Sequence, residues 1–421
     1  METLKFLFTT SYYPPYHLGG DAIHVKYLAE ELQRKGHEIH ILHSLDAYNV
    51  KRKNTPKSNR NEGIYTYPVK TQFSSSSYAA YMLGNSQVIT KKFDDLLKEI
   101  KPDVVHHNNI SLLGYNLLKK RSNYINLFTA HDCWLVCQQN NLLKNGAELC
   151  KRQPGQYCFS CALKLGRPPQ IWRFSQRFKR AIKDIDLIIS PSNNIRKTLL
   201  KKIDVKNVTL PNFVPSPPEK IASTSPSNYF LYVGMLEKHK GIRNLLEVFK
   251  ELKDGNPHLI IVGDGSLKKN IIEYIQNNSL ERAVSYMGYL EKKDLYPLYR
   301  GATALVIPSI CAENSPLTAL EALSVGTPVI ASNFGGLPEI VGLIDRNLIF
   351  DSWISLKNIL SSFKKDSLSR FIVQDIYEKN FSSKRYIERY LGLIRSLKCN
   401  NSSHIAAGNL QLKTQHQVLA S

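Results

Sequence analysis

Two glutamates eight residues apart are the part of this chain best suited to chemistry. Glu313 and Glu321 bracket a segment in which Ser315 is a good helix N-cap and Pro316 suits the first helical position. Free N–H groups at the start of such a helix favour a bound anion, and the carboxylates can accept hydrogen bonds from sugar hydroxyls. The segment predicts a site for a phosphorylated sugar; the plain alternative is that both glutamates are surface residues.

Glycine-rich turns follow several predicted strands and could approach a phosphate group. Gly234 ends one strand, and Lys240 follows six residues later. Gly263 ends another in a V-G-D-G turn, which is not the full G-x-G-x-x-G of nicotinamide-binding proteins. Gly19 and Gly20 lie between the first strand and the first helix. Backbone amides in such turns can bind phosphate, and a lysine can neutralise it. Plain strand-to-helix turns with a solvated lysine remain the alternative.

His131 and Asp132 follow the predicted strand Ile125–Thr129, so they should lie at the same edge of a sheet. A histidine beside a carboxylate can polarise or orient a hydroxyl group. A local hydrogen bond with no role in chemistry is the alternative.

The elements that must position these residues are alternating strands and helices. This alternation predicts parallel sheets covered on both faces. A helix is expected from about Ala22 to Lys35, ended by Gly36, and another near Pro316. The expected strands of the first half are Leu4–Thr9, His37–Leu42, Asp103–His106, Ile125–Thr129 and Leu187–Ser190, the last closing the set. Those of the second half are Tyr229–Val233, Leu259–Val262, Val284–Met287, Ala304–Ile307 and Pro328–Ala331.

A Pro- and Ser-rich stretch at 215–227 divides the chain into two such units. We expect an N-terminal domain over 1–212, a linker over 213–228 and a C-terminal domain over 229–380. A C-terminal helix over 381–398 and a mobile tail over 399–421 complete the chain. In doubly wound sheets, ligands bind beyond the carboxyl ends of the strands, so an interdomain cleft is the expected site.

Composition excludes several classes of protein. The 421 residues are 43% hydrophobic and 22% charged, which is neither disordered nor collagen-like. No apolar run approaches a membrane span, and the first residues do not resemble a secretory signal. The net charge is +21, of which +16 lies in residues 1–214. This half faces an anionic partner (phosphate, a membrane surface or nucleic acid), or it is simply well solvated.

Four of the seven cysteines, Cys137, Cys150, Cys158 and Cys161, lie within 25 residues of one another. They can form a small tetrahedral zinc site, pack as reduced thiols or form disulfides. A zinc ion here would brace a loop on the acceptor side and take no part in catalysis.

The ordered set of motifs resembles the retaining glycosyltransferases of family 4, which have the GT-B fold of two facing Rossmann-like domains. The matching residues are Gly19-Gly20, Pro102–His106, His131-Asp132, Ser190–Ser192, Val233-Gly234, Lys240-Gly241, Val262–Gly265, Met287–Tyr289 and the E-x7-E element from Glu313 to Glu321. The resemblance implies transfer of a sugar from a nucleotide-sugar donor with retention at the anomeric carbon. It also implies that the second domain holds the nucleotide and the first receives the acceptor.

The resemblance assigns roles residue by residue. Lys240 would neutralise the leaving diphosphate, Glu313 would bind donor-sugar hydroxyls and His131 would face the reacting sugar. Glu321 would hold the ribose, and the Gly20 amide would meet the distal phosphate. The remaining expected donor contacts are Gly19, Gly234, Gly263, Gly288, Tyr289, Asn314, Ser315, Pro316 and Leu317.

Two features bear on catalysis. The family places an arginine after the glycine of the Val-Gly element, but this chain has Met235 there. Lys238, His239 or Arg243 could take over the function of the missing arginine. The family needs no metal, and no D-x-D carboxylate pair is evident at the site. We therefore expect no cofactor for catalysis, and a same-face displacement without a covalent intermediate.

The acceptor side carries basic stretches at Ile171–Lys183 and Lys51–Arg60. They suggest docking on the anionic inner face of a membrane, with a lipid-linked or polysaccharide-assembly acceptor and a cytoplasmic location. A solvated helix face is the alternative. Rival functions are a nucleic-acid-binding protein, for which no recognised motif is present, a non-catalytic nucleotide-sugar-binding protein, or another GT-B enzyme such as a sugar-nucleotide epimerase.

Overall fold

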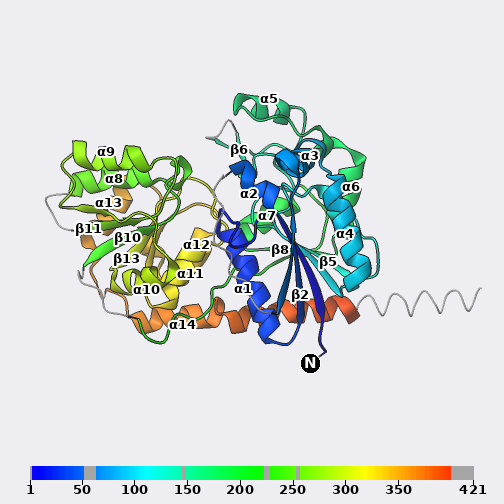
Figure 1. Cartoon of the computed structure of the whole chain (residues 1–421). Helices are drawn as coiled ribbons and strands as arrows, with labels where there is room; N and C mark the ends of the chain where they lie inside the picture. Colours follow the sequence, from blue (N-terminus) through cyan, green and yellow to red (C-terminus); the bar gives the residue numbers. More distant parts are fainter. Residues whose placement is uncertain are drawn as a thin grey trace, which may run out of the picture.

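Two parallel β-sheets, one in each half of the chain, organise the protein (Figure 1). The computed structural model describes residues 2–51, 63–144, 148–221, 228–252, 257–365 and 367–399. Each sheet is flanked by helices, so the predicted fold of two Rossmann-like domains facing across a cleft is confirmed.

The first domain contains a seven-stranded sheet in the order β3-β2-β1-β4-β5-β8-β9, in which every pairing is parallel. Its strands are β1 (Lys5–Thr10), β2 (Glu38–Ser44), β3 (Ile64–Val69), β4 (Val104–His107), β5 (Ile125–Thr129), β8 (Leu187–Ser190) and β9 (Asn207–Thr209). A separate hairpin pairs β6 (Leu143–Lys144) with β7 (Glu148–Leu149). The helices are α1 (Gly20–Arg34), α2 (Leu45–Lys51), α3 (Ser75–Leu83), α4 (Gln87–Ile100), α5 (Tyr157–Lys164), α6 (Gln176–Lys183) and α7 (Asn193–Leu200), with 3-10 turns η1 (Gln72–Ser74), η2 (Tyr115–Leu118) and η3 (Ile171–Phe174).

The second domain contains a six-stranded parallel sheet in the order β12-β11-β10-β13-β14-β15. Its strands are β10 (Tyr229–Val233), β11 (His258–Val262), β12 (Val284–Tyr286), β13 (Ala304–Ile307), β14 (Val329–Ser332) and β15 (Ile349–Phe350). Its helices are α8 (Ile242–Leu252), α9 (Lys268–Asn277), α10 (Lys292–Gly301), α11 (Leu317–Ser324), α12 (Leu337–Val341), α13 (Trp353–Ser362) and α14 (Arg370–Asn380), with 3-10 turns η4 (Lys238–Lys240) and η5 (Arg346–Leu348).

The first sheet extends beyond the predicted strands. Leu187–Ser190 does not close the set, because β9 pairs with it on one side of the sheet and β3 forms the opposite edge. Both added strands have partly exposed side chains, so they lack the continuous apolar run that marks a strand buried on both faces.

Burial on both faces explains the parallel sheets. In β1, Phe6 and Phe8 pack into one apolar cluster while Leu7 packs into the cluster on the other face. The cluster that contains Phe6 continues through Phe213 and Val214 into the second domain. The two domains therefore share one continuous core along part of their boundary.

In both sheets the strand order reverses beside the first strand, between β1 and β4 and between β10 and β13. Crevices at such switch points, beyond the carboxyl ends of the strands, are where doubly wound sheets bind ligands. The predicted site residues that follow β1, β10 and β13 are thus brought to two facing crevices.

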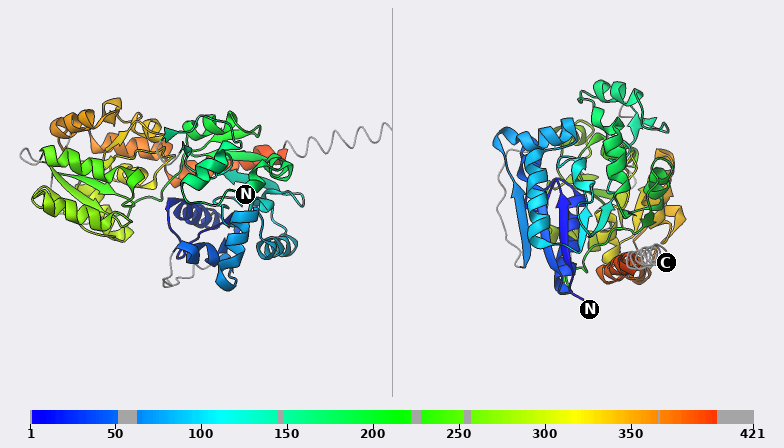
Figure 2. Two further views of the ribbon diagram at one scale, coloured as in Figure 1. Left: turned by 90° about the horizontal axis from the view of Figure 1, so that it is seen from above. Right: turned by 90° about the vertical axis from the view of Figure 1, so that its right-hand side faces the viewer.

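The end of the chain returns to the first domain. A helix over 383–399 follows α14 and lies along the end of the first domain where the chain begins (Figures 1 and 2). Its Tyr390 hydroxyl pairs with Nδ1 of the buried His106 at 2.9 Å, and Lys398 pairs with Glu2 at 3.2 Å. Val214 forms a parallel bridge with Ser382 where the chain crosses between domains. The predicted tail lies outside the described residues except for Cys399.

None of the helices in the described ranges is long and apolar enough to span a lipid bilayer.

The hydrogen bond between Tyr390 and His106 allows a test of whether the last helix stabilises the first domain. Tyr390→Phe leaves the buried Nδ1 of His106 without its partner, so we expect the free energy of unfolding in urea to fall by about 1–2 kcal/mol. Tyr78→Phe is the control, because Tyr78 is 55% exposed. Equal stability of the two variants would contradict a stabilising role for this hydrogen bond.

Candidate active site

A cavity of about 290 Å³ lies between the two domains, where their crevices meet. The first domain contributes Gly19, Gly20, Asp21, His131 and Asn212. The second contributes Tyr232, Val233, Gly234, Met235, Lys240, Val306, Ile307, Ser309, Glu313, Asn314, Ser315, Pro316, Leu317 and Thr318. All three predicted catalytic residues and most of the predicted donor-binding residues therefore line one space.

An ion pair between Lys240 and Glu313 lies in the wall of this cavity. Lys240 Nζ lies 2.5 Å from Glu313 Oε1, and the Ser309 hydroxyl donates to the same oxygen at 2.7 Å. Burial disfavours both charges, but each partner's charge outweighs it, so the pKa of Glu313 is lowered and that of Lys240 is raised. Both groups are therefore charged at neutral pH.

The backbone of Glu313 is fixed by the turn that precedes α12. Gly336 N donates to Glu313 O at 2.5 Å, and Gly335 forms a parallel bridge with Glu313. A side chain at Gly335 would collide with the Glu313 backbone, and φ there is +66°, which favours glycine. The glycine pair thus allows the close approach that sets the position of the carboxylate.

Two helix N-termini meet at the cavity. α1 begins at Gly20 and α11 at Leu317, and the Cβ position of Gly20 lies 3.6 Å from the Leu317 side chain. Asp21 is in the first turn of α1, and Asn109 Nδ2 donates to it at 2.7 Å. The positive ends of both helix dipoles therefore face the space in which an anion would bind.

The predicted cap of α11 is wrong by one residue. Pro316 is the N-cap and has extended backbone angles, while Ser315 precedes the helix and makes no cap hydrogen bond. Instead, the Ser315 hydroxyl accepts from the backbone N–H of Asn212 at 3.2 Å, and Asn212 Nδ2 donates to Ser315 O. Ser315 therefore joins the domains, a use of the hydroxyl that local sequence does not reveal.

His131 is held from both domains. Asn314 Nδ2 donates to its backbone carbonyl at 2.6 Å, and its Nε2 lies 2.9 Å from Asn108 Oδ1, which can only accept. Nε2 therefore carries the ring proton in the neutral form. Burial lowers the pKa of His131 to about 4, against the smaller opposing effect of Asp21. His131 can thus act at neutral pH only as an uncharged group.

Asp132 has a local role. Its Oδ1 accepts from the backbone N–H of Trp134 at 2.8 Å, and burial raises its pKa to about 7. The alternative to a chemical role was a local hydrogen bond, and Asp132 does accept one, from the backbone N–H of Trp134.

Glu321 does not line the cavity. It is buried, Tyr299 Oη donates to it at 3.1 Å, and Lys292 Nζ forms an ion pair with it at 3.6 Å. Lys292 Nζ also donates to Tyr27 Oη of α1 at 2.5 Å. The glutamate therefore lies in a polar cluster that bridges the domains one helical turn below the cavity, and its role toward ribose stays a prediction.

The other predicted glycine turns lie beside the cavity. Gly263 N donates to Gly288 O at 2.8 Å, and a side chain at Gly263 would collide with Gly234 O. The turns after β10, β11 and β12 are thus stacked side by side. Tyr289, next to these turns, is 73% exposed. Gly234 lines the cavity, whereas Gly263, Gly288 and Tyr289 do not.

Among the described residues that line the cavity, Lys240 is the one Lys or Arg, so no other cation takes the place of the arginine that the family has after the Val-Gly element. Met235 lines it, whereas Lys238, His239 and Arg243 do not. Arg243 stacks on Tyr274 and pairs with Glu247. The charged lining side chains are Asp21, Lys240 and Glu313, so with His131 neutral the formal charge of the lining is −1.

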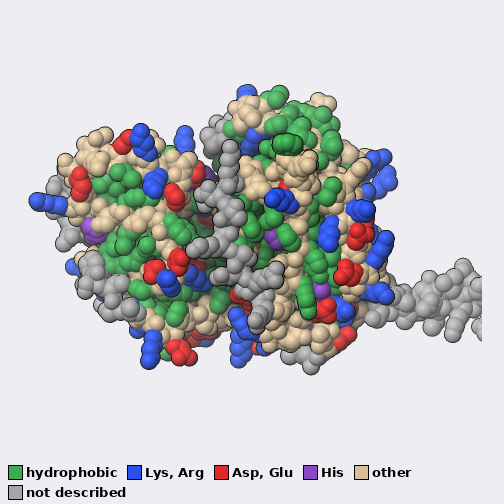
Figure 3. Space-filling model, in the orientation of Figure 1, with side chains coloured by type: hydrophobic (Ala, Val, Ile, Leu, Met, Phe, Trp, Pro, Cys, Tyr) green, Lys and Arg blue, Asp and Glu red, His purple; other side chains and the backbone are tan. Residues whose placement is uncertain are grey.

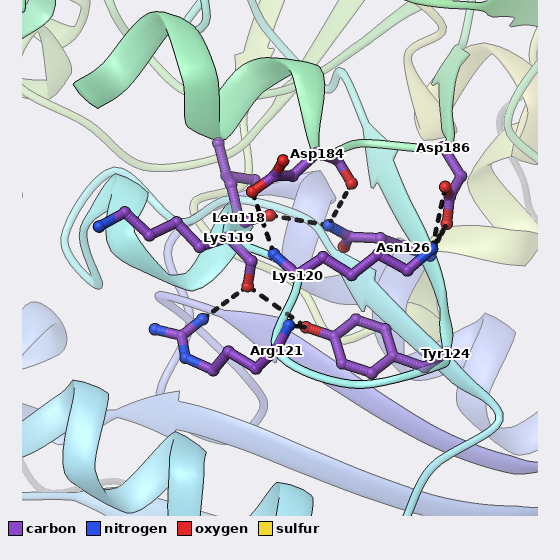
Figure 4. A network of polar contacts seen from close by, with 8 residues as sticks. All are labelled: Leu118, Lys119, Lys120, Arg121, Tyr124, Asn126, Asp184 and Asp186. Atoms are coloured by element: carbon purple, nitrogen blue, oxygen red, sulfur yellow. Dashed lines mark hydrogen bonds and ion pairs between the residues drawn. The ribbon is translucent and has the colours of Figure 1, made fainter. Parts of the chain in front are cut away.

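A D-x-D triplet does occur in the chain, at Asp184-Ile185-Asp186, where both aspartates contact residues of the loop before β5 (Figure 4). Asp186 pairs with Lys120 Nζ at 2.8 Å and accepts from the backbone N–H of Asn126 at 2.7 Å. It precedes β8 and so lies at the amino end of the strands. The triplet fixes the loop before β5 and does not face the cavity.

Sequence reasoning missed five polar residues of the cavity, namely Asp21, Asn212, Tyr232, Ser309 and Thr318. Asp21 and Ser309 stand next to motifs that were recognised, so their positions after β1 and β13 could have singled them out. Asn212 comes to the site with the segment that leaves the first domain, and no local pattern marks it.

The four clustered cysteines line a separate cavity of about 200 Å³ in the first domain. Cys137 comes from the loop after β5, Cys150 follows β7, and Cys158 and Cys161 are one turn apart in α5. All are free thiols. In the ranges described, no three His, Cys, Asp or Glu side chains are gathered closely enough to hold a metal ion.

Comparisons with known proteins place these features in a family. The family model for glycosyltransferase family 4 matches residues 18–216, and the model for glycosyl transferases group 1 matches residues 216–371. An uncharacterized glycosyltransferase of Methanocaldococcus jannaschii is 25% identical, over 84% of this chain and 86% of the relative. An uncharacterized 42.6 kDa protein in the cps region of Klebsiella pneumoniae is 24% identical, over 92% and 100%. An O-antigen chain mannosyltransferase B of Escherichia coli is 36% identical, over 29% and 32%.

Solved structures share the fold. Sucrose-phosphate synthase from Thermosynechococcus elongatus superposes with a TM-score of 0.71 at 18% identity, covering 95% of this chain and all of the synthase. Anabaena HepE in complex with UDP superposes with a TM-score of 0.62 at 15% identity, covering 94% and 100%.

The zinc site stays a prediction, and metal analysis tests it. One zinc ion per purified chain by plasma mass spectrometry, lost in the Cys158→Ser/Cys161→Ser variant, would favour the zinc site over the other two alternatives. Cys399→Ser is the control, because Cys399 is exposed and distant in sequence. Metal-free protein in which all four thiols react after denaturation would leave them as packed, reduced cysteines.

The environment of His131 predicts its titration. Its ring should stay neutral from about pH 8 to about pH 5 and titrate at about pH 4, measured by NMR with His131→Asn used to assign the signal. Because the folded-state pKa lies below the ordinary value, stability contributed by neutral His131 is full above that value and is lost as the pH falls through about 4. A pKa at the ordinary value would contradict its burial.

Proposed function

The chain belongs to the family-4 glycosyltransferases of GT-B fold, and from this we propose that it transfers a sugar, with retention, from a nucleotide-diphosphate sugar to a glycan acceptor. The observation that carries the proposal is the Lys240–Glu313 pair, set in an interdomain cavity at the start of two helices. Lys240 would stabilise the diphosphate as it leaves, and Glu313 would hold the donor sugar.

The charges in the cavity support this division of roles. A departing diphosphate develops negative charge, which fixed cations and helix N-termini stabilise where it forms. Lys240 is the cation among the lining side chains, and Glu313 holds its ammonium group in place before the donor enters. Because the lining carries −1 in formal charge, the two helix ends supply the rest of the positive potential.

The same contacts support a displacement on one face of the sugar. Glu313 is bound by Lys240 and Ser309, and Asp21 by Asn109, so both lining carboxylates already serve other partners. We therefore assign no covalent nucleophile. His131, uncharged and beside the cavity, would orient a hydroxyl of the reacting sugar. We expect no metal requirement; undiminished turnover in EDTA tests this.

The relatives support an acceptor in surface-polysaccharide assembly. One lies in a cps region, and another is an O-antigen chain mannosyltransferase. We propose a lipid-linked or polysaccharide-assembly glycan as acceptor and a location at the cytoplasmic face of the membrane. One structural neighbour was solved with UDP and another with ADP, so the base of the donor stays open.

A second candidate is a nucleotide-sugar-binding protein without transfer activity. It is favoured by Met235 in the arginine position and by a single lining cation that is already paired. Donor binding without turnover in the presence of acceptors would distinguish it from the enzyme. An epimerase of the same fold would turn over its sugar nucleotide with no acceptor.

A donor panel tests the function directly. We expect one of the UDP-, GDP- or ADP-sugars to raise the melting temperature, and turnover with a lipid-linked acceptor to give a product whose anomeric configuration, read by NMR, matches that of the donor. An inverted product would reject retention, and no shift with any donor would reject the function.

Variants of the ion pair locate the chemistry. Glu313→Gln and Lys240→Met should each lower kcat by about 10²–10³-fold, because each removes a group aimed at the reacting centre. Each also leaves a partly buried charge without its partner, which can destabilise the fold by about 1–3 kcal/mol. The double variant removes both charges and should recover stability without recovering activity. Near-normal turnover of Glu313→Gln would reject its assignment.

A further inference from the structure

Two segments of the first domain contain basic residues and no acidic ones. Residues 63–93 and 149–183 together hold twelve Lys or Arg and no Asp or Glu. Eleven of these cations are exposed; Arg173 is the exception. None of the twelve forms an ion pair with another described residue, whereas many cations elsewhere do. These segments therefore account for a large share of the net charge of +21.

Large apolar side chains are exposed on the same two segments. Phe73 is 93% exposed, Leu83 68%, Ile171 68% and Leu163 64%. Residues 163–168, with the sequence L-K-L-G-R-P, are exposed without interruption. Exposed apolar groups gathered in this way mark an interaction surface on a soluble domain.

The two segments pack against each other and make one surface. Tyr81 of α3 accepts from the Trp172 side chain at 3.0 Å through its carbonyl, which fixes α3 to η3. Phe159 of α5 stacks on Phe174 of η3 with ring centroids 5.1 Å apart. We call the exposed side chains of α3, α5, η3 and the 163–168 loop the basic apolar face. Of the eleven exposed cations, Lys164 and Arg167 lie on it, and Arg152 lines the same cavity as Lys164. Figure 3 shows hydrophobic side chains gathered over the upper end of the first domain, where Figure 1 places α3 and α5.

Two of the three aromatic residues at 171–183 are not part of this surface. Trp172 and Phe178 are buried, in contact with Tyr115 and Trp134, so the predicted docking helix is instead η3 and α6 with their rings in the core. Its basic residues other than Arg173 remain exposed. The other predicted docking segment, Lys51–Arg60, lies outside the described residues except for its first position.

The face lies at the same end of the domain as the cavity. β1 runs from the end where the chain begins toward the end that carries α3 and α5 (Figure 1). The loop that starts at His131 continues to β6, whose Lys144 lines the same cavity as Lys164 of α5. A partner held on this face would therefore lie beside the carboxyl ends of the strands.

We propose that the basic apolar face docks the protein on a bilayer of anionic phospholipid. The proposal rests on the proposed function in one respect: docking would bring a membrane-held acceptor to the cleft. The cations complement the lipid headgroups, and side chains such as Leu83 and Leu163 insert between them. Nucleic acid could bind the cations but would make no use of the exposed leucines and isoleucine. The combination of cations and exposed apolar side chains therefore favours lipid.

Vesicle co-sedimentation of the full chain tests the proposal. Binding is expected to vesicles of phosphatidylglycerol in phosphatidylcholine, not to phosphatidylcholine alone, and high salt should weaken it. Lys164→Ala/Arg167→Ala should bind about 25-fold more weakly, because each cation near an anionic surface contributes about fivefold. Leu83→Ser/Leu163→Ser should also weaken binding, while its donor-induced thermal shift stays unchanged.

The matched control is Phe371→Ser in the second domain, which removes a side chain that is 78% exposed but far from this face in sequence. It should bind vesicles like the parent chain. Absence of binding to phosphatidylglycerol vesicles, or equal binding by all variants, would overturn the proposal. So would tight binding to duplex DNA together with vesicle binding that the leucine variant does not weaken. Donor binding is read separately, so failure here leaves the proposed function intact.

Discussion

The ion pair between Lys240 and Glu313 constrains the rest of the site. A partly buried carboxylate and a partly buried ammonium group stabilise each other's charge only when they are in contact, so their backbones must be placed with little freedom. Ser309 supplies the remaining hydrogen bond, and the glycine turn before α12 packs directly against the Glu313 backbone. The second sheet brings these segments together because β10 and β13 are neighbours.

Contacts between the domains are as specific as the pair itself. Asn314 next to Glu313 donates to the His131 carbonyl, and Asn212 donates two hydrogen bonds to Ser315. Glu339, two residues into α12, accepts from the backbone N–H groups of Asn193 and Asn194 at the start of α7. The residues that shape the donor side therefore also set the distance to the acceptor side, so that binding and interdomain geometry depend on the same few side chains.

Sequence alone indicated the two sheets well and the site in part. Strands such as Ile125–Thr129 and Ala304–Ile307 match because they are buried on both faces and read as continuous apolar runs. Edge strands such as β9 gave no such signal. Lys240 and Glu313 followed from motif order, but their pairing joins residues 73 positions apart. The burial of Glu321 beside Lys292 and Tyr27 could not be foreseen, because it depends on how the domains meet.

The return of the last helix to the first domain means that the domains are connected twice. The two crossings lie side by side, with Val214 bridged to Ser382 and Tyr377 Oη donating to Val214 O at 2.8 Å. Two adjacent connections allow one domain to rotate about a single axis relative to the other, and they resist twisting or sliding between the domains. Relative movement of the domains is therefore restrained beside Asn212, whose hydrogen bonds to Ser315 join the two lobes.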